Sequence, residues 1–261
     1  MTSSTTSPRA ADGRNMVATT LFCVSTFLAP LAVHTQPLSG DGYLFRQPRA
    51  SFTLRGGYSQ PAATGDVFSH AIRNLTLGRS DFGALNVTGD VGIRLLSRLS
   101  LQFTGGFSES NADSEMRYWI DNNDQPITQT TTVIRAPLMA GLRLDLTSPG
   151  RSVGKLAYIP SRITPYISGG VGSMYYKFRQ VGSFKDDNSL DVLDLTLETT
   201  GRSFASYGAI GADISLMPTL AFTTEARYES SHARPSGYSF GDFDRLDLSG
   251  VTATVGLTFR Y

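Results

Sequence analysis

The sequence predicts an all-β protein, an eight-stranded antiparallel up-and-down transmembrane β-barrel. Three observations predict this fold. Apolar and polar residues alternate with a period of two in eight separate runs, the connections between these runs differ regularly in length, and the polar faces carry arginine and carboxylate side chains but no lysine.

The eight alternating runs are each long enough to cross a bilayer at a tilt, which takes about 9–11 residues. Residues 220–230 show the pattern most clearly, because Leu220 and Phe222 would lie on one face and Thr223 and Glu225 on the other. Residues 165–178 are rich in glycine and tyrosine, so the sequence does not distinguish their two faces. After Gln36 no segment has a convincing helical period. The runs are 50–58, 82–95, 99–108, 132–146, 165–178, 203–216, 220–230 and 251–261.

The connections between the runs follow the order long, short, long, medium, long, short, long. Residues 96–98 and 217–219 are tight turns, whereas 59–81, 182–202 and 232–247 are long, as is the segment that contains Trp119. This order is expected when hairpins alternate between the outside of the cell and the periplasm. An even number of strands then returns both ends of the barrel to the periplasm.

The first 35 residues have the pattern of a secretory signal peptide. Arg9 and Arg14 precede the apolar stretch 16–33, and cleavage is expected near Thr35. The alternative is a membrane-anchoring helix, which the proline and hydroxyl residues of the stretch disfavour. The one cysteine, Cys23, lies in this segment, so the mature chain would contain none. We therefore expect a signal peptide over 1–35, a periplasmic lead-in over 36–48 and the barrel over 49–261.

Charge placement separates a membrane barrel from a soluble one. On a water-facing surface lysine is common and the signs need not balance, whereas arginine forks pair with carboxylates in an enclosed interior. Arg227, flanked by Glu225 and Glu229 on one face, is expected to meet charges on neighbouring strands. The predicted barrel-interior charge network is Arg55, Asp90, Arg94, Arg135, Arg143, Asp145, Asp213, Glu225, Arg227, Glu229 and Arg260.

Composition argues against several classes of function. The formal net charge of +1 gives no reason to expect a nucleic-acid partner, and a mean hydropathy of −0.11 is too polar for a bundle of membrane helices. Without clustered His, Cys, Asp or Glu and without a phosphate-binding glycine loop, we expect no metal, no cofactor and no enzymatic activity.

The final strand resembles the C-terminal strand of bacterial outer-membrane proteins. Tyr261 is aromatic, and Phe259, Leu257 and Val255 alternate before it. The resemblance implies that these four residues form the signal read by the outer-membrane barrel assembly machinery. The mature chain is similar as a whole to the small barrels of the outer-membrane protein A-like and W-like class. This implies a location in the cell outer membrane, reached through the periplasm, with outer-membrane lipid as a partner.

Three classes of function remain open. We favour a structural or interaction barrel whose interior is filled by the charge network and whose outer loops are available for ligand or surface contacts. The W-like resemblance also implies a narrow channel or carrier for small solutes. A lipid A-modifying enzyme is the third class, because Ser231, His232 and Glu229 are similar to the residue types of outer-membrane deacylases. However, Arg234 replaces the serine expected two positions after the histidine.

Apolar residues in two predicted outer loops are candidates for a binding surface. We expect them to anchor the loops at the membrane interface, and the alternative is a receptor, adhesion or small hydrophobic ligand surface. His70 and His232 are expected to be ordinary loop residues. The apolar residues are Tyr118, Trp119 and Ile120 in the second loop and Tyr238, Phe240 and Phe243 in the last.

Overall fold

The structure is a computed structural model that describes residues 43–120, 124–154, 157–185, 192–235, 240 and 243–261. The predicted signal peptide and Tyr238 lie outside the described residues. No helix among the described residues is long and apolar enough to cross a membrane.

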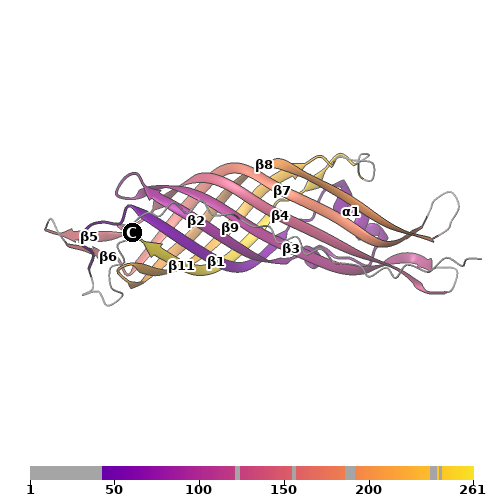
Figure 1. Cartoon of the computed structure of the whole chain (residues 1–261), viewed down its shortest axis with the longest axis horizontal. Helices are drawn as coiled ribbons and strands as arrows, with labels where there is room; N and C mark the ends of the chain where they lie inside the picture. The colour runs from indigo at the N-terminus through magenta and orange to yellow at the C-terminus, as the bar shows by residue number, and fades with distance from the viewer. Residues whose placement is uncertain (1–42, 121–123, 155–156, 186–191, 236–239, 241–242) are drawn as a thin grey trace, which may run out of the picture. The chain divides into compact units, whose positions relative to one another are not determined.

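Eight long strands form a closed antiparallel ring (Figure 1), which confirms the predicted fold class. Around the ring each strand pairs with its neighbours in chain order, and β11 closes it by pairing with both β9 and β1. Closure leaves no unpaired sheet edge where the ring crosses lipid, which offers no partner for backbone groups. The strands are β1 (Ala50–Pro61), β2 (Ala84–Arg94), β3 (Leu99–Ile120), β4 (Pro126–Asp145), β7 (Ile163–Lys185), β8 (Val192–Met217), β9 (Leu220–Ala233) and β11 (Gly250–Arg260).

The outer face of the ring carries a continuous apolar band. Leu142 is 48% exposed and Ile210 is 65% exposed, whereas inward residues such as Thr223 are fully buried. A band of exposed aliphatic side chains would be unfavourable in water, but lipid acyl chains cover it in a membrane. Phe107 and Tyr175 lie at the margin of the band near the long connections, as expected for side chains at a membrane interface.

Four strands continue past the apolar band on the side of the long connections. The outward residue changes from Phe107 to Glu109 on β3 and from Phe204 to Arg202 on β8. The segments of β3, β4, β7 and β8 beyond the band therefore form a protruding sheet with a polar outer face. These strands occupy much of two segments that the sequence predicts to be long loops. In the sequence a strand is recognised by apolar residues that face lipid alternating with polar residues that face the interior, and this alternation ends where the apolar band ends.

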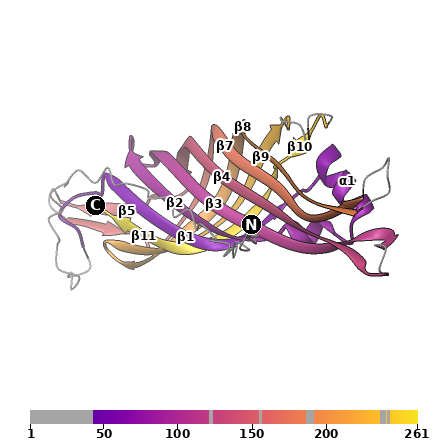
Figure 2. The ribbon, with the colours of Figure 1, turned by 45° about the vertical axis from the view of Figure 1, so that its right-hand side comes forward.

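The first long connection contains two short helices, α1 (Asp66–Asn74) and η1 (Arg79–Phe82), so the expectation of no helix is wrong. At nine residues α1 is too short for its period to stand out in the sequence, and tertiary packing stabilises it. Val67, Phe68 and Ala71 form its buried face. Figures 1 and 2 show α1 at the end of the barrel opposite the C-terminus.

Apolar side chains fill the interior at this end of the barrel. We call this cluster the apolar plug. It draws on α1, on η1, on the inner faces of the ring strands and on the last long connection, which includes β10 (Leu246–Asp247). Its members are Ala63, Val67, Phe68, Ala71, Leu75, Leu77, Phe82, Ala112, Val133, Met139, Met174, Tyr176, Phe178, Ala205, Tyr207, Ala209, Ala233, Phe240, Leu246 and Leu248.

The plug corrects the prediction for the last loop. Phe240 is 4% exposed and its ring centroid lies 5.4 Å from that of Phe178, so it packs inside the protein and not at the membrane interface. Phe243 packs against the plug as well. Tyr118 and Trp119 belong to the end of β3 and not to a loop, and Tyr118 is 96% exposed.

At the opposite end the medium connection forms a hairpin of β5 (Gly150–Val153) and β6 (Ala157–Pro160). Leu44 of the lead-in exchanges two backbone hydrogen bonds with Tyr158, at 2.8 and 2.7 Å. The structure also settles the faces of β7: Tyr166, Met174 and Phe178 point inward, whereas Ile167 and Val171 are exposed on the apolar band.

The apolar band makes a testable prediction about which surface meets lipid. Leu142→Arg places a charge in the middle of the band on β4 and should destabilise the barrel in lipid by about 2–4 kcal/mol. Thr128→Arg adds the same charge on the same face of β4, but in the protruding sheet, and should change stability by less than about 0.5 kcal/mol. Urea unfolding in lipid vesicles measures both changes, and equal costs would contradict the placement of the band.

Candidate functional site

The eleven predicted network residues all point into the barrel. Eight are buried, and Arg94, Arg143 and Arg260 are partly buried near the end that carries the C-terminus. Nine of the eleven residues form two groups, four residues at mid-barrel and five at the mouth near the C-terminus, whereas Arg135 and Glu229 lie between the mid-barrel group and the apolar plug. Each strand contributes inward positions at several heights. The register of the ring therefore decides which charges meet.

The central network consists of Arg55, Asp90, Glu225 and Arg227. The Arg55 guanidinium lies 2.6 Å from Asp90 Oδ2 and 3.1 Å from Glu225 Oε2. Arg227 Nη2 lies 2.9 Å from Glu225 Oε1 and 3.8 Å from Asp90 Oδ1. Each cation therefore touches both anions. These contacts join β1, β2 and β9 across the interior. Arg227 on β9 therefore meets Asp90 on β2, which is not a neighbouring strand, contrary to the expectation from the sequence.

Neutral side chains from the other strands complete the central network. Tyr166 donates a hydrogen bond to Glu225 Oε2 at 2.9 Å, and Thr104 donates one to Asp90 Oδ1 at 2.6 Å. The Arg227 guanidinium lies over the Tyr207 ring, 4.3 Å from its centroid. Buried charges are tolerated only when they are paired and hydrogen-bonded. All four charges are paired and each has at least one hydrogen bond, although Arg55 Nη2, Asp90 Oδ2 and Arg227 Nη2 make ion-pair contacts without one.

Arg135 links the charged interior to the apolar plug. It donates hydrogen bonds to Ser59 Oγ at 2.6 Å and to the backbone oxygen of Leu248 at 3.2 Å. Among the described carboxylates none lies within ion-pair distance of it. Glu229, the other charge at this height, lies 4.0 Å from Arg227. The sequence places both residues inside the barrel but does not reveal that Arg135 is held mainly by neutral oxygens.

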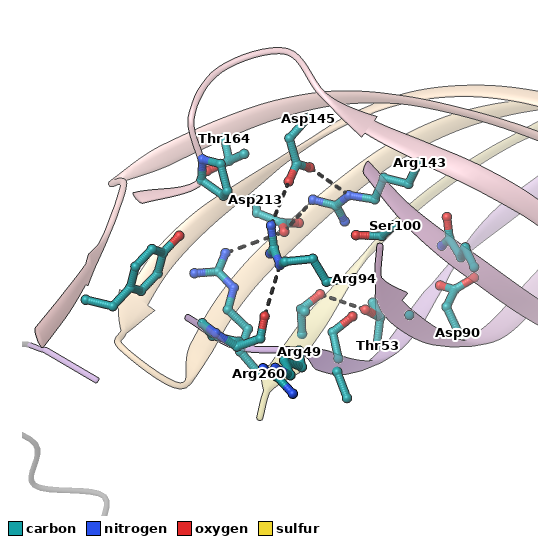
Figure 3. A pocket seen from close by; sticks show the side chains of 18 residues that line it. Arg49, Thr53, Asp90, Arg94, Ser100, Arg143, Asp145, Thr164, Asp213 and Arg260 are labelled. Atoms are coloured by element: carbon teal, nitrogen blue, oxygen red, sulfur yellow. Dashed lines mark hydrogen bonds and ion pairs between the residues drawn. The ribbon is translucent and has the colours of Figure 1, made fainter. Parts of the chain in front are cut away.

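The second group lies at the mouth of the barrel near the C-terminus (Figure 3). Arg143 lies 2.7 Å from Asp213 and 3.1 Å from Asp145. Its guanidinium also stacks on Tyr166, 3.7 Å from the centroid of the ring. Asp213 is also 3.4 Å from Arg260, and Asp145 is 3.9 Å from Arg94. The cavity among these residues measures about 50 Å³, which holds a few water molecules but no larger solute.

The lead-in lies against this mouth. Arg94 Nε donates to the backbone oxygen of Pro48 at 3.0 Å, and Pro48 and Tyr158 both line the small cavity. Because Leu44 pairs with Tyr158, the lead-in and the β5–β6 hairpin hold each other at the mouth. The sequence gives no sign of this contact, since it joins two segments of unremarkable composition.

Asp247 fastens the apolar plug to the ring. It accepts hydrogen bonds from the Thr64 hydroxyl and from the backbone N–H of Ser249, and His232 Nε2 lies 3.5 Å away. Burial alone would raise the pKa of Asp247, but these hydrogen bonds and His232 outweigh it and hold the pKa below its ordinary value. The carboxylate joins the segment before α1, β9 and the last connection.

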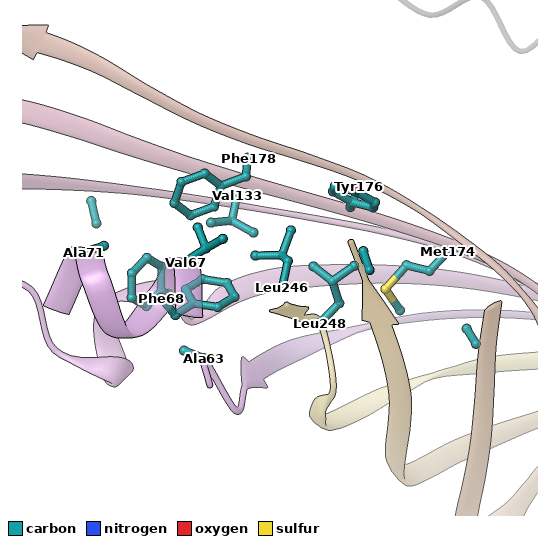
Figure 4. Packing of buried hydrophobic residues seen from close by; sticks show 14 of the residues in the cluster. Ala63, Val67, Phe68, Ala71, Val133, Met174, Tyr176, Phe178, Leu246 and Leu248 are labelled. Atoms are coloured by element: carbon teal, nitrogen blue, oxygen red, sulfur yellow. The ribbon is translucent and has the colours of Figure 1, made fainter. Parts of the chain in front are cut away.

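Figure 4 shows the plug from close by, with Val67 and Phe68 of α1 facing Phe178 and Leu246. Phe68 stacks edge-on against Phe82 and Phe178, with ring centroids 4.9 and 5.7 Å apart. These edge-to-face contacts fix α1 inside the barrel. The sequence signals for the plug are few: the apolar face of α1, which consists of three residues, and the apolar residues Phe240 and Phe243 in the last long connection.

The residues similar to a deacylase site are not brought together. Ser231 and His232 are adjacent on β9 and therefore point to opposite faces, and the Ser231 hydroxyl lies 2.7 Å from Ser203 Oγ. Glu229 faces Arg227. His70 belongs to α1 and His232 to β9, so neither is a loop residue. Within the described ranges no group of three His, Cys, Asp or Glu side chains is placed to hold a metal ion.

The predicted assembly-signal residues lie on one face of the chain's last strand. Val255, Leu257 and Phe259 point outward from β11 into the apolar band, and Tyr261 follows the strand directly. Their recognition by the assembly machinery stays a prediction.

Comparisons with known proteins agree with this architecture. A model of the outer membrane protein β-barrel domain matches residues 25–259. No curated protein matches the chain in sequence.

Three solved structures illustrate the range of similar barrels. The outer membrane protein OprG of Pseudomonas aeruginosa is 13% identical, with a TM-score of 0.46 over 84% of this chain and 99% of that one. The Escherichia coli outer membrane protein W is 14% identical, with a TM-score of 0.39 over 83% and 100%. The Escherichia coli outer membrane protease OmpT is 8% identical, with a TM-score of 0.39 over 86% and 100%. Similarity at this level carries no inference about activity.

The central network makes a prediction about stability. Arg55→Met removes the cation that touches Asp90 and Glu225 and leaves both anions sharing Arg227, so it should destabilise the barrel by about 3–5 kcal/mol. Arg260→Met is the matched control, because Asp213 keeps Arg143 and the site is partly exposed; it should cost at most about 1 kcal/mol. Chemical unfolding in lipid vesicles measures both. A loss of under 1 kcal/mol for Arg55→Met would contradict the assigned contacts.

The low pKa of Asp247 makes a prediction about pH. A carboxylate whose pKa is lower in the folded state stabilises that state above its ordinary pKa, and the stabilisation is lost as the pH falls through the folded value. Asp247→Asn should therefore lower the thermal unfolding midpoint at pH 7, and the gap from the wild type should narrow as the pH falls below 4. A gap that stays constant from pH 7 to pH 2 would refute the role given to Asp247.

Proposed function

Since the chain belongs to the outer membrane protein β-barrel domain family, we propose that it is a structural and interaction barrel of the outer membrane that does not conduct solutes. The interior supports this proposal most directly. Two successive layers, the central network and the apolar plug, occupy the lumen of an eight-stranded ring, which is only wide enough for side chains.

The two layers oppose passage for different physical reasons. An ion entering the central network would have to displace guanidinium–carboxylate contacts as short as 2.6 Å. A polar solute entering the plug would have to leave water for an apolar interior without hydrogen-bond partners. The channel or carrier function is therefore the weaker alternative.

The protruding sheet offers the surface for interactions. At its tip Tyr118 and Ile120 are exposed, and Lys185 Nζ lies 3.7 Å from the centroid of the Trp119 ring. Exposed aromatic residues at the tip of a sheet that extends beyond the apolar band are suited to contact a partner or a surface outside the cell. A small hydrophobic ligand is the alternative occupant of this tip.

The proposal includes the route to the membrane. We propose that residues 1–35 act as a signal peptide, that residues 36–48 remain in the periplasm, and that the assembly machinery reads Val255, Leu257, Phe259 and Tyr261. The absence of catalysis is likewise part of the proposal. An assay of lipid A acyl chains, with His232→Ala as the comparison, tests for the deacylase alternative.

Two measurements test the closed interior. In planar bilayers the purified barrel should give no steady conductance steps. A cysteine in the lumen, Ser168→Cys, should resist a charged thiol reagent, whereas Ser152→Cys on the exposed β5–β6 hairpin should react at once. Conductance that falls when the reagent modifies Ser168→Cys would establish a pore through this barrel and overturn the proposal. Conductance insensitive to that reaction would come from a contaminating porin.

A further inference from the structure

Three cations lie together on the outer wall just beyond the apolar band. Lys177 and Arg179 point outward from β7, and Arg202 points outward from β8. We call these three residues the β7–β8 basic patch. Tyr175 and Phe204 are the last exposed aromatic residues of the band on these two strands. Phe204 lies below Arg202 on β8, and Tyr175 lies below Lys177 on β7 and opposite Arg202.

Strand register brings the three cations close to one another. Lys177 is opposite Thr200 and Arg202 is opposite Tyr175, so Arg202 is the diagonal neighbour of Lys177, at about 7–8 Å. Lys177 Nζ and Arg179 Nε lie 3.0 and 3.8 Å from the same oxygen of Glu198.

The patch carries more positive charge than its surroundings balance. Arg202 is exposed and forms no ion pair or side-chain hydrogen bond with a described residue. Glu198 is the one carboxylate in contact with the patch among the described residues, so two of the three positive charges have no acidic counterpart. A dianionic or monoanionic group can lie between Lys177 and Arg202 and contact both.

At the other edge of the protruding sheet, along β3, the outer face is negatively charged. Directly beyond Phe107, β3 presents Glu109, Asp113 and Glu115 on its outer face. The acidic segment of β3 and the basic segments of β7 and β8 begin at the same margin of the apolar band. The difference in charge between them is therefore not caused by a difference in depth in the membrane. An anionic group at that depth is attracted to the β7–β8 side and repelled from the β3 side.

We propose that the β7–β8 basic patch binds the phosphate groups of a lipid in the outer leaflet. The headgroups of that leaflet lie at the level where the apolar band ends, and the acyl chains of the same lipid would lie on the band below, against Phe204 and Val171. A lipid is favoured over free phosphate, because a freely soluble anion gains only the screened electrostatic attraction of an exposed site. The site lies outside the barrel and is independent of the closed interior proposed above.

The test measures binding of a lipid A disaccharide with two phosphates to the folded barrel in detergent by native mass spectrometry. Removing Lys177 and Arg202 in Lys177→Gln/Arg202→Gln should weaken binding by about fivefold per cation, or about 25-fold together. Glu198→Gln should strengthen binding by a few-fold, since it removes the competing carboxylate. Arg151→Gln, which removes an exposed cation from the β5–β6 hairpin, is the matched control and should bind as the wild type does.

Two further arms separate the sources of the anion. The same disaccharide without phosphates should bind at least tenfold more weakly, and millimolar inorganic phosphate should not displace the phosphorylated lipid. Wild-type affinity in the double variant, equal losses in Arg151→Gln, or ready displacement by inorganic phosphate would each overturn the proposal. Arg202→Lys, which keeps the charge, should retain most of the affinity and so distinguishes lost binding from lost folding.

Discussion

The pairing of β11 with both β9 and β1 is the constraint on which the rest of the structure depends. Lipid cannot satisfy backbone N–H and C=O groups, so a sheet crosses a membrane only when its two edges meet. Closure then fixes which side chains face lipid and which face inward, since residues alternate along every strand. The apolar band and the charged interior are two results of the same closure.

Eight strands enclose a space that side chains must fill, and this chain fills it in two different ways. At mid-barrel, Arg55 and Arg227 each contact Asp90 and Glu225, so the burial cost of every charge is offset by two opposite charges. At the other end four paired strands continue into the protruding sheet, and there α1 supplies Phe68 to the apolar plug. Arg135, bonded to Leu248, lies where the two fillings meet.

The ring and its faces could be predicted because lipid and the barrel interior differ so strongly in polarity. Along β9 every second residue from Phe222 to Tyr228 faces lipid, and the residues between them face the barrel interior, so apolar and polar residues alternate in the sequence. Beyond the band the outer face of β3 is polar and its inner face mixes Ser110 and Ser114 with Ala112, so the alternation weakens while the strand continues. The pairing of Arg227 with Asp90, three strands away, depends on register and is not encoded in local sequence.

The plug and the basic patch could not be predicted because both depend on contacts between residues that are far apart in the sequence. α1 is nine residues long and buries only one of its faces. Phe68 on that face contacts Phe178, which is more than a hundred positions away, so no local periodicity in the sequence indicates the contact. Lys177 and Arg202 are ordinary surface residues in sequence, and they become one patch only through the register of β7 and β8. In a barrel of this size, residues that could bind other molecules therefore have to be identified from the strand register and from their position relative to the apolar band. Once the lumen is filled, the surfaces left to meet other molecules are the outer wall and the protruding sheet.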